Sequence, residues 1–545
     1  MSVTRPPLAP SERVELDGVA AAVQDRFRPS VSLSRGEGGV ALSISLQQPS
    51  SLPSLSKFLF WEAGCSFGGV IVEQRPLNWR LSYVFLAPRS GWIEVVLQVP
   101  LETSSVPSIS SELHAADWYE REAEDLFGLQ FEGHPRLGDF ILHDQFWPEG
   151  LAPQRKLQRK SVDAHQMRFR RRSNPDWRPL LVVQDPGSFA MPVGPVYEGG
   201  VGESVHFLLE TVGEDVVRAV PRLFYNFRAV EKIAEGKSVL DTLLLAERFA
   251  ATSSFAHSLA FSLAVERMCD LEIPARARHL RILFSELERL RHHVGAITGI
   301  CESTALAVAA AQAAIIEERL LRASCRVSGH RYLFGLNTPG GLRRDFATKD
   351  FQELVIAVDH AVDELRVLEE RLHFTSSFLD RLEDVGVVDP DKARDLNLVG
   401  PVGRASGRGH DLRQECPYTG YDEYEFEVPR ETEGDGYARL RVLLGEAHQA
   451  ASLIHQALER LEPGPVLAGC DVPSSGAALG WVEAPIGAAL QWIRLDGNGL
   501  VERYRAITPS FNNWNGFHVA VEDFAFQDFP IILATFGLSA TECDR

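Results

Sequence analysis

The chain has 545 residues, enough for two to four domains with well-formed hydrophobic cores. Its formal net charge is −19 at pH 7, which argues against general nucleic-acid binding. No apolar run approaches the roughly 20 residues that span a bilayer, and the N-terminus lacks the apolar core of a signal peptide. We therefore expect a cytoplasmic protein with no transmembrane segment of its own.

The first 150 residues have the pattern of a small α+β domain. Residues 31–46 and 77–101 alternate apolar and polar side chains, as half-buried strands do. Residues 110–129 follow with the pattern of a helix that carries acidic side chains in its middle.

Residues 151–190 form a basic linker, which contains QRKLQRKSVDAHQMRFRRRSNPDWRP. Proline and Asn-Pro punctuation within it favours an extended arm. Two interpretations remain open. It is either a solvated strap that contacts acidic surface, or a docking strip for a partner subunit or for lipid headgroups.

Residues 191–545 are mainly helical in pattern, with strand and turn material at both ends. Long amphipathic runs occur at 237–270, 274–299, 303–328, 349–385 and 434–461. These runs are long enough to pack as a bundle. A strand pair is predicted over 487–507, where Asp-Gly-Asn-Gly supplies the turn. The sequence thus predicts an α+β fold: a small N-terminal α/β domain and a mainly helical bundle domain with peripheral β-structure.

The seven cysteines are scattered, and no two form a Cys-x-x-Cys pair. This distribution is typical of a reducing compartment with buried or inert thiols. It offers no thiolate cluster for zinc or for an iron–sulfur centre. Glycine-rich nucleotide-binding motifs are also missing, so nothing suggests that this chain itself binds a nucleotide.

Two stretches carry a family resemblance. DWYEREAEDLFGLQFEGHPRL (117–137) resembles the signature of the C subunit of bacterial respiratory complex I, the NADH–quinone oxidoreductase. GPVYEGGVGESVHFLLE (194–210) begins an ordered series of motifs that continues through RHLRILFSELERLRHHVG, GPVGRASGRGHDLRQECPYTGYDEYEFEVP and GWVEAPIGAALQWIRLDG. This series is similar to the large subunit of group 4, energy-converting NiFe hydrogenases and to its relative, the D subunit of complex I. A C-like domain fused to a D-like domain is the order found in formate hydrogenlyase-type large subunits.

The resemblance implies two cysteine pairs that would hold a nickel–iron centre. Residues without a thiol stand at these four ligand positions: Ala250 and Ser253 in AERFAATSSFAHS (246–258), and Ser539 and Glu542 in FGLSATECDR (536–545). Cys543 falls one place off. Because a nickel–iron site needs soft thiolate ligands, we expect no metal here and no cofactor bound by this chain itself.

Two further differences from the hydrogenases agree with that expectation. Ile486 stands where they carry an arginine, expected above the metal centre. The hydrogenases also often carry a C-terminal tail that is cut off after nickel is loaded. A chain that loads no nickel would need no such tail after Arg545. By contrast, Glu-x-Asp-Arg is what complex I D subunits show at the end of this motif.

The resemblance to complex I D subunits implies a quinone site, and this chain departs from it too. Tyr197 stands at the position of a histidine, Ala251 at that of a tyrosine and Ser303 at that of an aspartate. Ala251 and Ser303 cannot deliver protons near neutral pH, whereas Tyr197 could donate a hydrogen bond. A candidate acceptor cavity then combines the following residues: Tyr197, Arg248, His257, Ser303 and Glu542.

Charged residues persist in otherwise apolar helices. Glu286 and Arg289 lie three residues apart and can pair, while Arg281 and Glu288 lie on one side of the same helix, which also carries His293. Two interpretations remain open: ion pairs that hold the bundle together, and a proton or electrostatic path from an ancestral redox cavity toward membrane subunits.

The predicted N-terminal helix carries a further charged group: Glu120, Arg121, Glu124 and Asp125. We expect these residues to hold their domain to neighbouring subunits. His206 is expected to be structural, and EGHP (132–135) is expected to form a turn.

The resemblance implies a place in a membrane-associated complex, peripheral on the inner face of the cytoplasmic membrane. Its neighbours would be a small iron–sulfur subunit and antiporter-like membrane subunits. One hypothesis is an oxidoreductase subunit, free of nickel, that couples electron transfer from the iron–sulfur partner to a quinone-like acceptor and to ion translocation; NAD chemistry would belong to a partner. The second is a non-catalytic scaffold. The missing thiolates oppose the third, an active NiFe hydrogenase.

Overall fold

The computed structural model describes residues 15–103, 105–135, 140–141, 152–155, 187–196 and 205–545. Most of the predicted basic linker, residues 156–186, lies outside these ranges, as does Tyr197.

The N-terminal part is a five-stranded mixed sheet with strand order β1-β2-β5-β4-β3. β2 and β5 are parallel, and the other neighbours are antiparallel. The strands are β1 (Val31–Arg35), β2 (Val40–Leu46), β3 (Ser66–Gln74), β4 (Asn78–Ala87) and β5 (Gly91–Pro100). The accompanying elements are α1 (Leu16–Phe27), α2 (Leu52–Lys57), α3 (Asp117–Phe127) and the parallel pair β6 (Ser105–Pro107) and β7 (Gln130–Glu132).

β4 and β5 are buried on both faces along most of their length, which corrects the prediction of half-buried strands for residues 77–101, whereas β2 alternates as predicted. The edge strand β3 is buried along almost its whole length as well. The cause is the C-terminal part of the chain, which covers the second face. Trp92 on β5 packs on Trp481 with ring centres 5.8 Å apart, and the Leu479 N–H donates to the Gly38 carbonyl at 2.7 Å.

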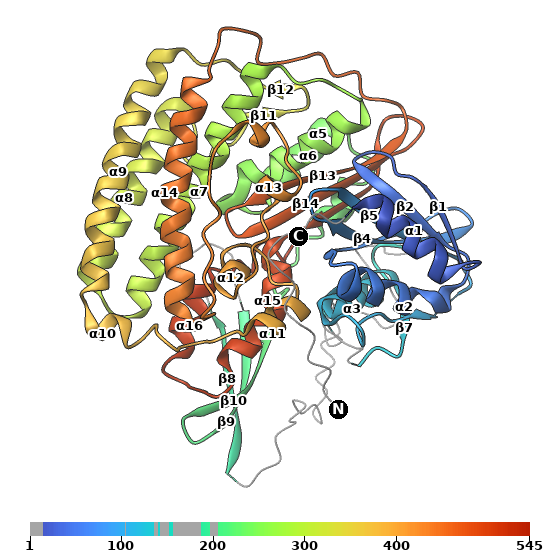
Figure 1. Cartoon of the computed structure of the whole chain (residues 1–545), viewed down its shortest axis with the longest axis horizontal. Helices are drawn as coiled ribbons and strands as arrows, with labels where there is room; N and C mark the ends of the chain where they lie inside the picture. The colour runs from blue at the N-terminus through green and yellow to red at the C-terminus, as the bar shows by residue number, and fades with distance from the viewer. Residues whose placement is uncertain (1–14, 104, 136–139, 142–151, 156–186, 197–204) are drawn as a thin grey trace, which may run out of the picture.

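The C-terminal part is built on a layer of four long helices, shown together on one side of Figure 1: α7 (Ala275–Ser303), α8 (Ala307–Ser328), α9 (Gln352–His373) and α14 (Gly436–Glu459). They confirm four of the predicted helices, although the run at 349–385 ends early in α9 and continues as the short α10 (Ser376–Leu379). Shorter elements surround the layer: α4 (Val230–Ala234), α5 (Val239–Arg248), α6 (Ser254–Met268), β11 (Asn337–Thr338), β12 (Gly341–Leu342), α11 (Pro390–Asp395), α12 (Gly400–Ala405), α13 (Leu412–Glu415), α15 (Pro509–Val521) and α16 (Phe529–Phe536).

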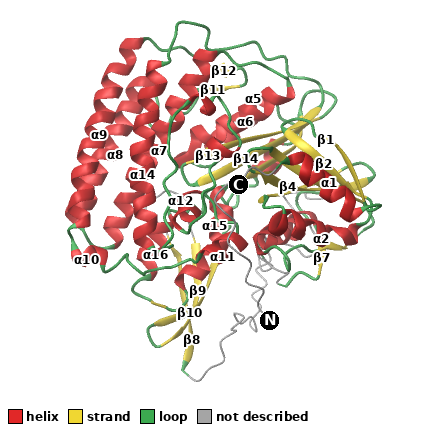
Figure 2. Ribbon diagram, viewed as in Figure 1, coloured by secondary structure: helices red, strands yellow, loops and turns green. Residues whose placement is uncertain are grey.

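A three-stranded antiparallel sheet lies between the helical layer and the N-terminal sheet (Figure 2). Its strands are β13 (Gly476–Ala484), β14 (Gly487–Leu495) and β15 (Val501–Ile507). The predicted strand pair and its turn are confirmed, since Asp496 accepts the N–H of Asn498 at 2.8 Å within the turn. α6 packs directly on β13: a Cβ added at Gly480 would lie 1.9 Å from the Ala260 carbonyl oxygen.

A separate sheet of four strands extends from one end of the molecule (Figure 1). It contains β8 (Ser188–Val196), β9 (Val205–Val212), β10 (Asp215–Arg222) and β16 (Phe524–Ala525). With it, the predicted α+β fold class is confirmed.

Buried ion pairs join the N-terminal and C-terminal parts. Glu231 binds Arg503 at 2.8 Å and Arg505 at 3.1 Å, and Arg505 also pairs with Glu122 of α3. Arg545 reaches Glu122 at 3.2 Å and is buried. Because each carboxylate has at least two guanidinium partners, the junction satisfies the condition under which buried charges are tolerated.

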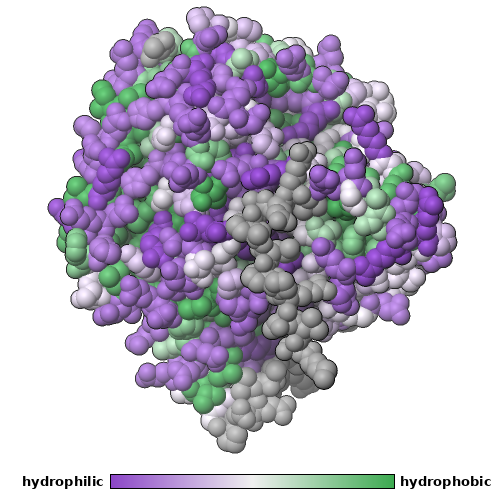
Figure 3. Space-filling view, viewed as in Figure 1, coloured by the Kyte–Doolittle hydropathy of each residue, from purple (hydrophilic) through white to green (hydrophobic). Residues whose placement is uncertain are grey.

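Hydrophilic side chains predominate on the face of the molecule shown in Figure 3, and hydrophobic ones form small scattered groups. Among the described residues, no helix has both the length and the apolar character needed to cross a membrane.

Candidate functional site

The predicted helix 237–270 is interrupted at the first pair of ligand positions. α5 ends at Arg248, α6 begins at Ser254, and a 3₁₀ turn, Ala251–Ser253, lies between them. Ala250 is extended, with φ −139° and ψ 100°, which breaks the helical hydrogen-bond ladder. The prediction of one continuous helix is therefore wrong.

Glu288, on α7, caps the start of α6. Its carboxylate accepts the backbone N–H of Phe255 at 2.7 Å and that of Ala256 at 2.9 Å. No side chain at the N-cap of α6 accepts a hydrogen bond from its first turn. Glu288 therefore accepts two backbone N–H groups of that turn that have no partner within the helix. Burial raises the pKa of Glu288 to about 7, against the opposing effect of Arg291.

The C-terminal segment meets the start of α6 at one buried pair. His257 Nε2 lies 3.2 Å from Glu542 Oε1, although the two residues are 285 positions apart, and both side chains are fully buried. Glu542 Oε2 accepts the N–H of Ser510 at 3.2 Å. Burial alone would raise the pKa of Glu542, but the hydrogen bonds from His257 and Ser510 outweigh it and hold that pKa below its usual value.

His257 also joins a row of hydrogen bonds that runs through Gln491 to Tyr504. The Tyr504 hydroxyl donates to Gln491 Oε1 at 2.5 Å, and Gln491 Nε2 donates to His257 Nδ1 at 3.2 Å. An amide NH₂ can only donate, so this arrangement places the imidazole proton on Nε2, from which it is donated to Glu542. The ring of Phe249 packs 4.5 Å from the imidazole.

The four ligand positions are buried and carry no sulfur. The N–H of Glu542 donates to Ser539 Oγ at 3.3 Å, and the N–H of Ser539 donates to Ser510 Oγ at 3.2 Å. Hydroxyl and carboxylate oxygens are hard donors and alanine offers none, so this donor set does not fit a nickel–iron centre. The neighbouring thiol of Cys543 donates instead to the Ser539 carbonyl at 3.7 Å. Within the described ranges, no three His, Cys, Asp or Glu side chains gather as metal ligands.

Arg248 lies at the surface rather than beside the buried pair. Its side chain is 58 % exposed, its Nε is 3.5 Å from Glu247, and its guanidinium carbon lies 5.7 Å from the centre of the Phe334 ring. Ala251 is exposed as well. These residues therefore belong to an outward face of the molecule.

The remaining residues of the candidate cavity do not join the pair either. Ser303 ends α7, about 22 Å along the helix axis from Glu288, and its hydroxyl donates to the Ile300 carbonyl at 2.9 Å. Tyr197 lies outside the described residues. Of the five residues predicted to line one cavity, the structure brings only His257 and Glu542 together among those that it describes.

A second group of polar side chains lies where α7 and α14 meet β13 and the loop that follows α12. We call it the buried charge cluster, and it consists of Glu286, Arg289, His293, Arg404, Asp411, Arg413, Glu446 and Glu483. Of these residues, only Glu286, Arg289 and His293 on α7 could be picked out from the sequence.

Arg289 ties α7 to β13. Its Nε lies 3.1 Å from Glu286, which confirms the predicted pair, and its terminal nitrogens donate to the carbonyls of Glu483 at 2.6 Å and Ala484 at 3.2 Å. Arg281 does not pair with Glu288; it binds Glu266 on α6 at 2.6 Å. α7 is thereby fixed to both β13 and α6.

Arg404 and Glu446 form the centre of the cluster. Arg404 Nε donates to Glu446 at 2.6 Å, and its Nη1 donates to Glu483 at 2.8 Å. His293 Nε2 lies 2.9 Å from the other oxygen of Glu446. Arg413 extends the cluster by binding Asp411 at 2.7 Å and Glu286 at 3.2 Å.

The cluster combines three arginines with four carboxylates, and their pKa values differ. Burial alone would raise the pKa of Glu446, but Arg404 and His293 reverse this and hold it far below its usual range. Burial lowers the pKa of His293, which leaves that imidazole neutral at pH 7. Burial and the charge of Asp411 raise the pKa of Glu483 to about 7. Near neutral pH, proton uptake at Glu483 therefore changes the net charge of these groups between −1 and zero.

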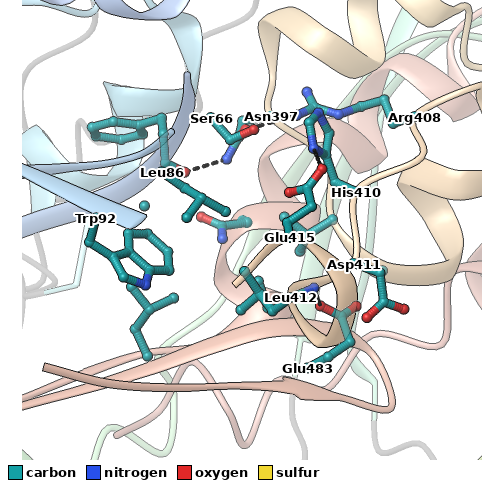
Figure 4. Close-up of a pocket in the computed structure, with 17 residues that line it drawn as sticks. Ser66, Leu86, Trp92, Asn397, Arg408, His410, Asp411, Leu412, Glu415 and Glu483 are labelled. Carbon is teal, nitrogen blue, oxygen red and sulfur yellow. Dashed lines mark hydrogen bonds and ion pairs between the residues drawn. The ribbon is translucent and has the colours of Figure 1, made fainter. Parts of the chain in front are cut away.

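A cavity of about 40 Å³ lies beside the cluster, at the junction with the N-terminal sheet (Figure 4). It is far smaller than the roughly 300–1,000 Å³ of an organic ligand pocket, but it has room for water. Glu483 and Glu415 reach it from one side and Trp92 from the other. Glu415 Oε2 and Arg408 Nε, both in its lining, are buried without a hydrogen-bond partner among the described residues, so water is the expected partner for both.

Glu120 and Asp125 of α3 make internal contacts, which corrects the prediction that they hold the domain to neighbouring subunits, whereas that prediction stays untested for Arg121 and Glu124. Glu120 is fully buried and accepts the Ser110 hydroxyl at 2.7 Å and the Ile109 N–H at 2.8 Å. Burial raises its pKa to about 7. Asp125 accepts the Ile141 N–H at 2.6 Å.

The remaining predictions concern Arg121 and Glu124 of α3, the turn at EGHP and His206. Arg121 lies over the Phe140 ring, 4.4 Å from its centre, and Glu124 is half-buried. The predicted turn at EGHP is confirmed at Gly133, whose φ is +83°. Burial and then Arg222 lower the pKa of His206 on β9, and its structural role stays a prediction.

Known proteins match both parts of this structure. Residues 47–161 match the family "Respiratory-chain NADH dehydrogenase, 30 Kd subunit", and residues 310–472 and 466–545 match "Respiratory-chain NADH dehydrogenase, 49 Kd subunit". Formate hydrogenlyase subunit 5 of Escherichia coli (strain K12) is 30% identical over 504 residues, covering 91% of this chain and 87% of the relative. The chain belongs to the family of complex I 49-kDa subunits and energy-converting hydrogenase large subunits.

Further relatives come from both branches of this family. Hydrogenase-4 component G of Escherichia coli (strain K12) is 27% identical over 541 residues, covering 97% of this chain and 92% of the relative. NADH-quinone oxidoreductase subunit 4 of Thermus thermophilus is 34% identical over 280 residues, covering 50% of this chain and 67% of the relative. The resemblance inferred from the sequence motifs is thus confirmed.

Proposed function

We propose that this chain is the complex I D-like subunit of a membrane-associated, multisubunit oxidoreductase and that it works without a nickel–iron centre. One observation carries the proposal. The segments that hold the four ligand positions meet at the His257–Glu542 pair, with hydroxyl, carboxylate and methyl groups where thiolates would be needed.

The proposed partners are supported by the names of the relatives, which describe subunits of formate hydrogenlyase and NADH-quinone oxidoreductase. Electrons come from a small iron–sulfur subunit, and antiporter-like membrane subunits move ions. The chain is held peripherally on the inner face of the membrane through these partners.

The buried charge cluster is the proposed coupling element. It spans α7, α14 and β13, and Glu483 changes its protonation near neutral pH beside a cavity with room for water. A change in the charge of Glu483 alters the field on Arg404, which shares its guanidinium with Glu446 on α14. Electron transfer at one face can thus bias the packing of the long helices.

The proposed acceptor is a quinone-like carrier at the surface around Arg248. The described residues do not form a closed quinone site, because Ala251 has no donor and Ser303 lies elsewhere. Arg248 offers an exposed hydrogen-bond donor beside the Phe334 ring. An adjacent subunit must complete such a site. No proton transfer to the acceptor is therefore assigned to the His257–Glu542 pair.

The second candidate is a scaffold without redox turnover. The observation that favours it is the complete burial and hydrogen bonding of His257 and Glu542, which leaves neither side chain open to an acceptor. In that case the charge cluster would transmit conformational changes of a partner only.

The purified complex in liposomes tests both candidates through quinone-dependent oxidation of the reduced partner and the ions moved per electron. We expect Arg248→Ala to lower the oxidation rate at least about tenfold, which corresponds to loss of about one charged hydrogen bond. Glu483→Gln should keep electron transfer and lower the ion-to-electron ratio, whereas its control, the surface variant Glu369→Gln, should change neither. A wild-type complex that assembles but oxidises no partner with quinone would favour the scaffold, and an unchanged ratio in Glu483→Gln would refute the coupling role.

A further inference from the structure

Two thiols that are far apart in the sequence meet at the C-terminal end of α6. Cys269 follows the last residue of α6, and Cys470 lies in the loop between α14 and β13, 201 positions away. Their Sγ atoms are 3.4 Å apart, and both side chains are partly accessible to solvent. A disulfide requires about 2.05 Å, so the sulfurs need to approach by about 1.4 Å.

The loop that carries Cys470 is anchored on both sides and free to adjust between its anchors. The N–H of Ala468 donates to the Gly340 carbonyl at 2.9 Å, and the Ser474 carbonyl accepts the N–H of Gly499 at 2.9 Å. A Cβ added at Gly469 would meet nothing within 4 Å. Closing the remaining gap between the sulfurs requires side-chain rotation and a small movement of the loop between these two anchors.

The contact makes the two thiols chemically unequal. Burial raises the pKa of Cys269, and the hydrogen bond with Cys470 partly offsets this rise. Burial and the same hydrogen bond raise the pKa of Cys470 to about 12. The shared hydrogen bond therefore favours the thiolate of Cys269 over that of Cys470.

We infer that Cys269 and Cys470 form an oxidant-responsive disulfide and that a peroxide is the oxidant. The Cys269 thiolate attacks hydrogen peroxide; an S–O bond forms, the O–O bond breaks, and the released hydroxide leaves as water with the thiol proton. Cys470 then attacks the sulfenic acid; the S–S bond forms, the S–O bond breaks, and a second water leaves. Two thiols lose two electrons in total, and one peroxide is reduced to two waters.

The disulfide would join two elements that position the sites described above. α6 carries His257 near its start, and the Cys470 loop leads directly into β13, which carries Glu483. A covalent link at this end closes a loop of about 200 residues and restrains the sliding of α6 along β13. Oxidation therefore stiffens the contact between the two elements and leaves their surfaces unchanged.

The test uses the full-length chain, treated with hydrogen peroxide and mapped by mass spectrometry without reduction. We expect a Cys269–Cys470 linked peptide, a rise in Tm of a few degrees, and reversal of both by dithiothreitol. Cys470→Ser should abolish the link and leave a Cys269 sulfenic acid that dimedone traps. Cys325→Ser, which removes the exposed thiol of α8, should leave the link intact. Peroxide treatment that oxidises Cys325 while Cys269 and Cys470 stay thiols, or become separate sulfinic acids, would overturn the inference.

Discussion

Glu446→Gln probes the centre of the buried charge cluster with almost no change in shape. Glu446 is buried on α14, where one oxygen accepts Arg404 Nε at 2.6 Å and the other faces His293 Nε2 at 2.9 Å. Arg404 can only donate, so a glutamine must keep its oxygen toward Arg404 and turn its NH₂ group toward His293. The variant therefore loses the buried charge that pairs with Arg404, and His293 must accept through Nε2 instead of donating.

The expected loss of stability is about 3–5 kcal/mol, the usual result of breaking a buried ion pair from one side. At about 2.1 cal mol⁻¹ K⁻¹ per residue, the unfolding entropy of 545 residues is about 1.1 kcal mol⁻¹ K⁻¹. For a chain that unfolds as one unit, Tm then falls by about 3–4 °C. Differential scanning calorimetry of the purified chain at pH 7 measures this shift.

The matched control is Glu369→Gln, which removes the carboxylate from a surface pair with His448 at 3.1 Å. Glu369 is 44% exposed, so its loss should cost less than about 1 kcal/mol and move Tm by less than about 1 °C. Equal shifts in the two variants would refute the claim that the cluster is an energetically essential buried network.

The sign of the pH dependence gives a second check on Glu446. Its pKa is depressed in the folded chain, so its contribution is complete above the unfolded-state pKa of about 4.3 and is lost as the pH falls toward the folded-state value. The wild type should therefore lose more stability than Glu446→Gln on acidification below about pH 4.3.

Three further predictions concern the capped helix, the junction and the close helix–strand contact. Burial raises the pKa of Glu288 from 4.5 to about 7, so wild-type stability should fall by about 3 kcal/mol as the pH rises through this interval; parallel denaturation profiles of wild type and Glu288→Gln would contradict this. Glu231→Gln, at the junction, should cost about 3–5 kcal/mol and speed cleavage between the two parts in limited proteolysis, and an unchanged cleavage rate would count against it. Gly480→Ala should yield no soluble chain, because its Cβ would lie 1.9 Å from the Ala260 carbonyl oxygen, whereas Gly497→Ala, which meets nothing within 4 Å, should express normally; equal yields would refute the reasoning.

Local pattern was enough to predict the long helices and one hairpin. α7, α8 and α14 follow the apolar periodicity of their own sequences, and the turn before β15 follows from Asp-Gly-Asn-Gly. The break before α6 could not be predicted in the same way. Small residues permit a helix there, and the extended backbone of Ala250 together with a cap from Glu288 decides otherwise.

The candidate sites depended on contacts over long sequence separations. Motif alignment predicted that both halves of the ligand set share a site, and the contact of His257 with Glu542 agrees with this prediction. The same alignment could not show that Arg248 is exposed. The missed members lie in the glycine-rich segment GRASGRGHDLR (403–413), which has no apolar periodicity that would predict burial, and their partners on α14 and β13 are distant in sequence.

The metal content of the purified complex tests the central claim most directly. Nickel and iron are measured by inductively coupled plasma mass spectrometry and normalised to the amount of this chain. We predict no nickel above background, and iron only in the amount that the iron–sulfur partner accounts for. One nickel per chain would contradict the account and would show that the C-terminal residues occupy the ligand positions in a different alignment.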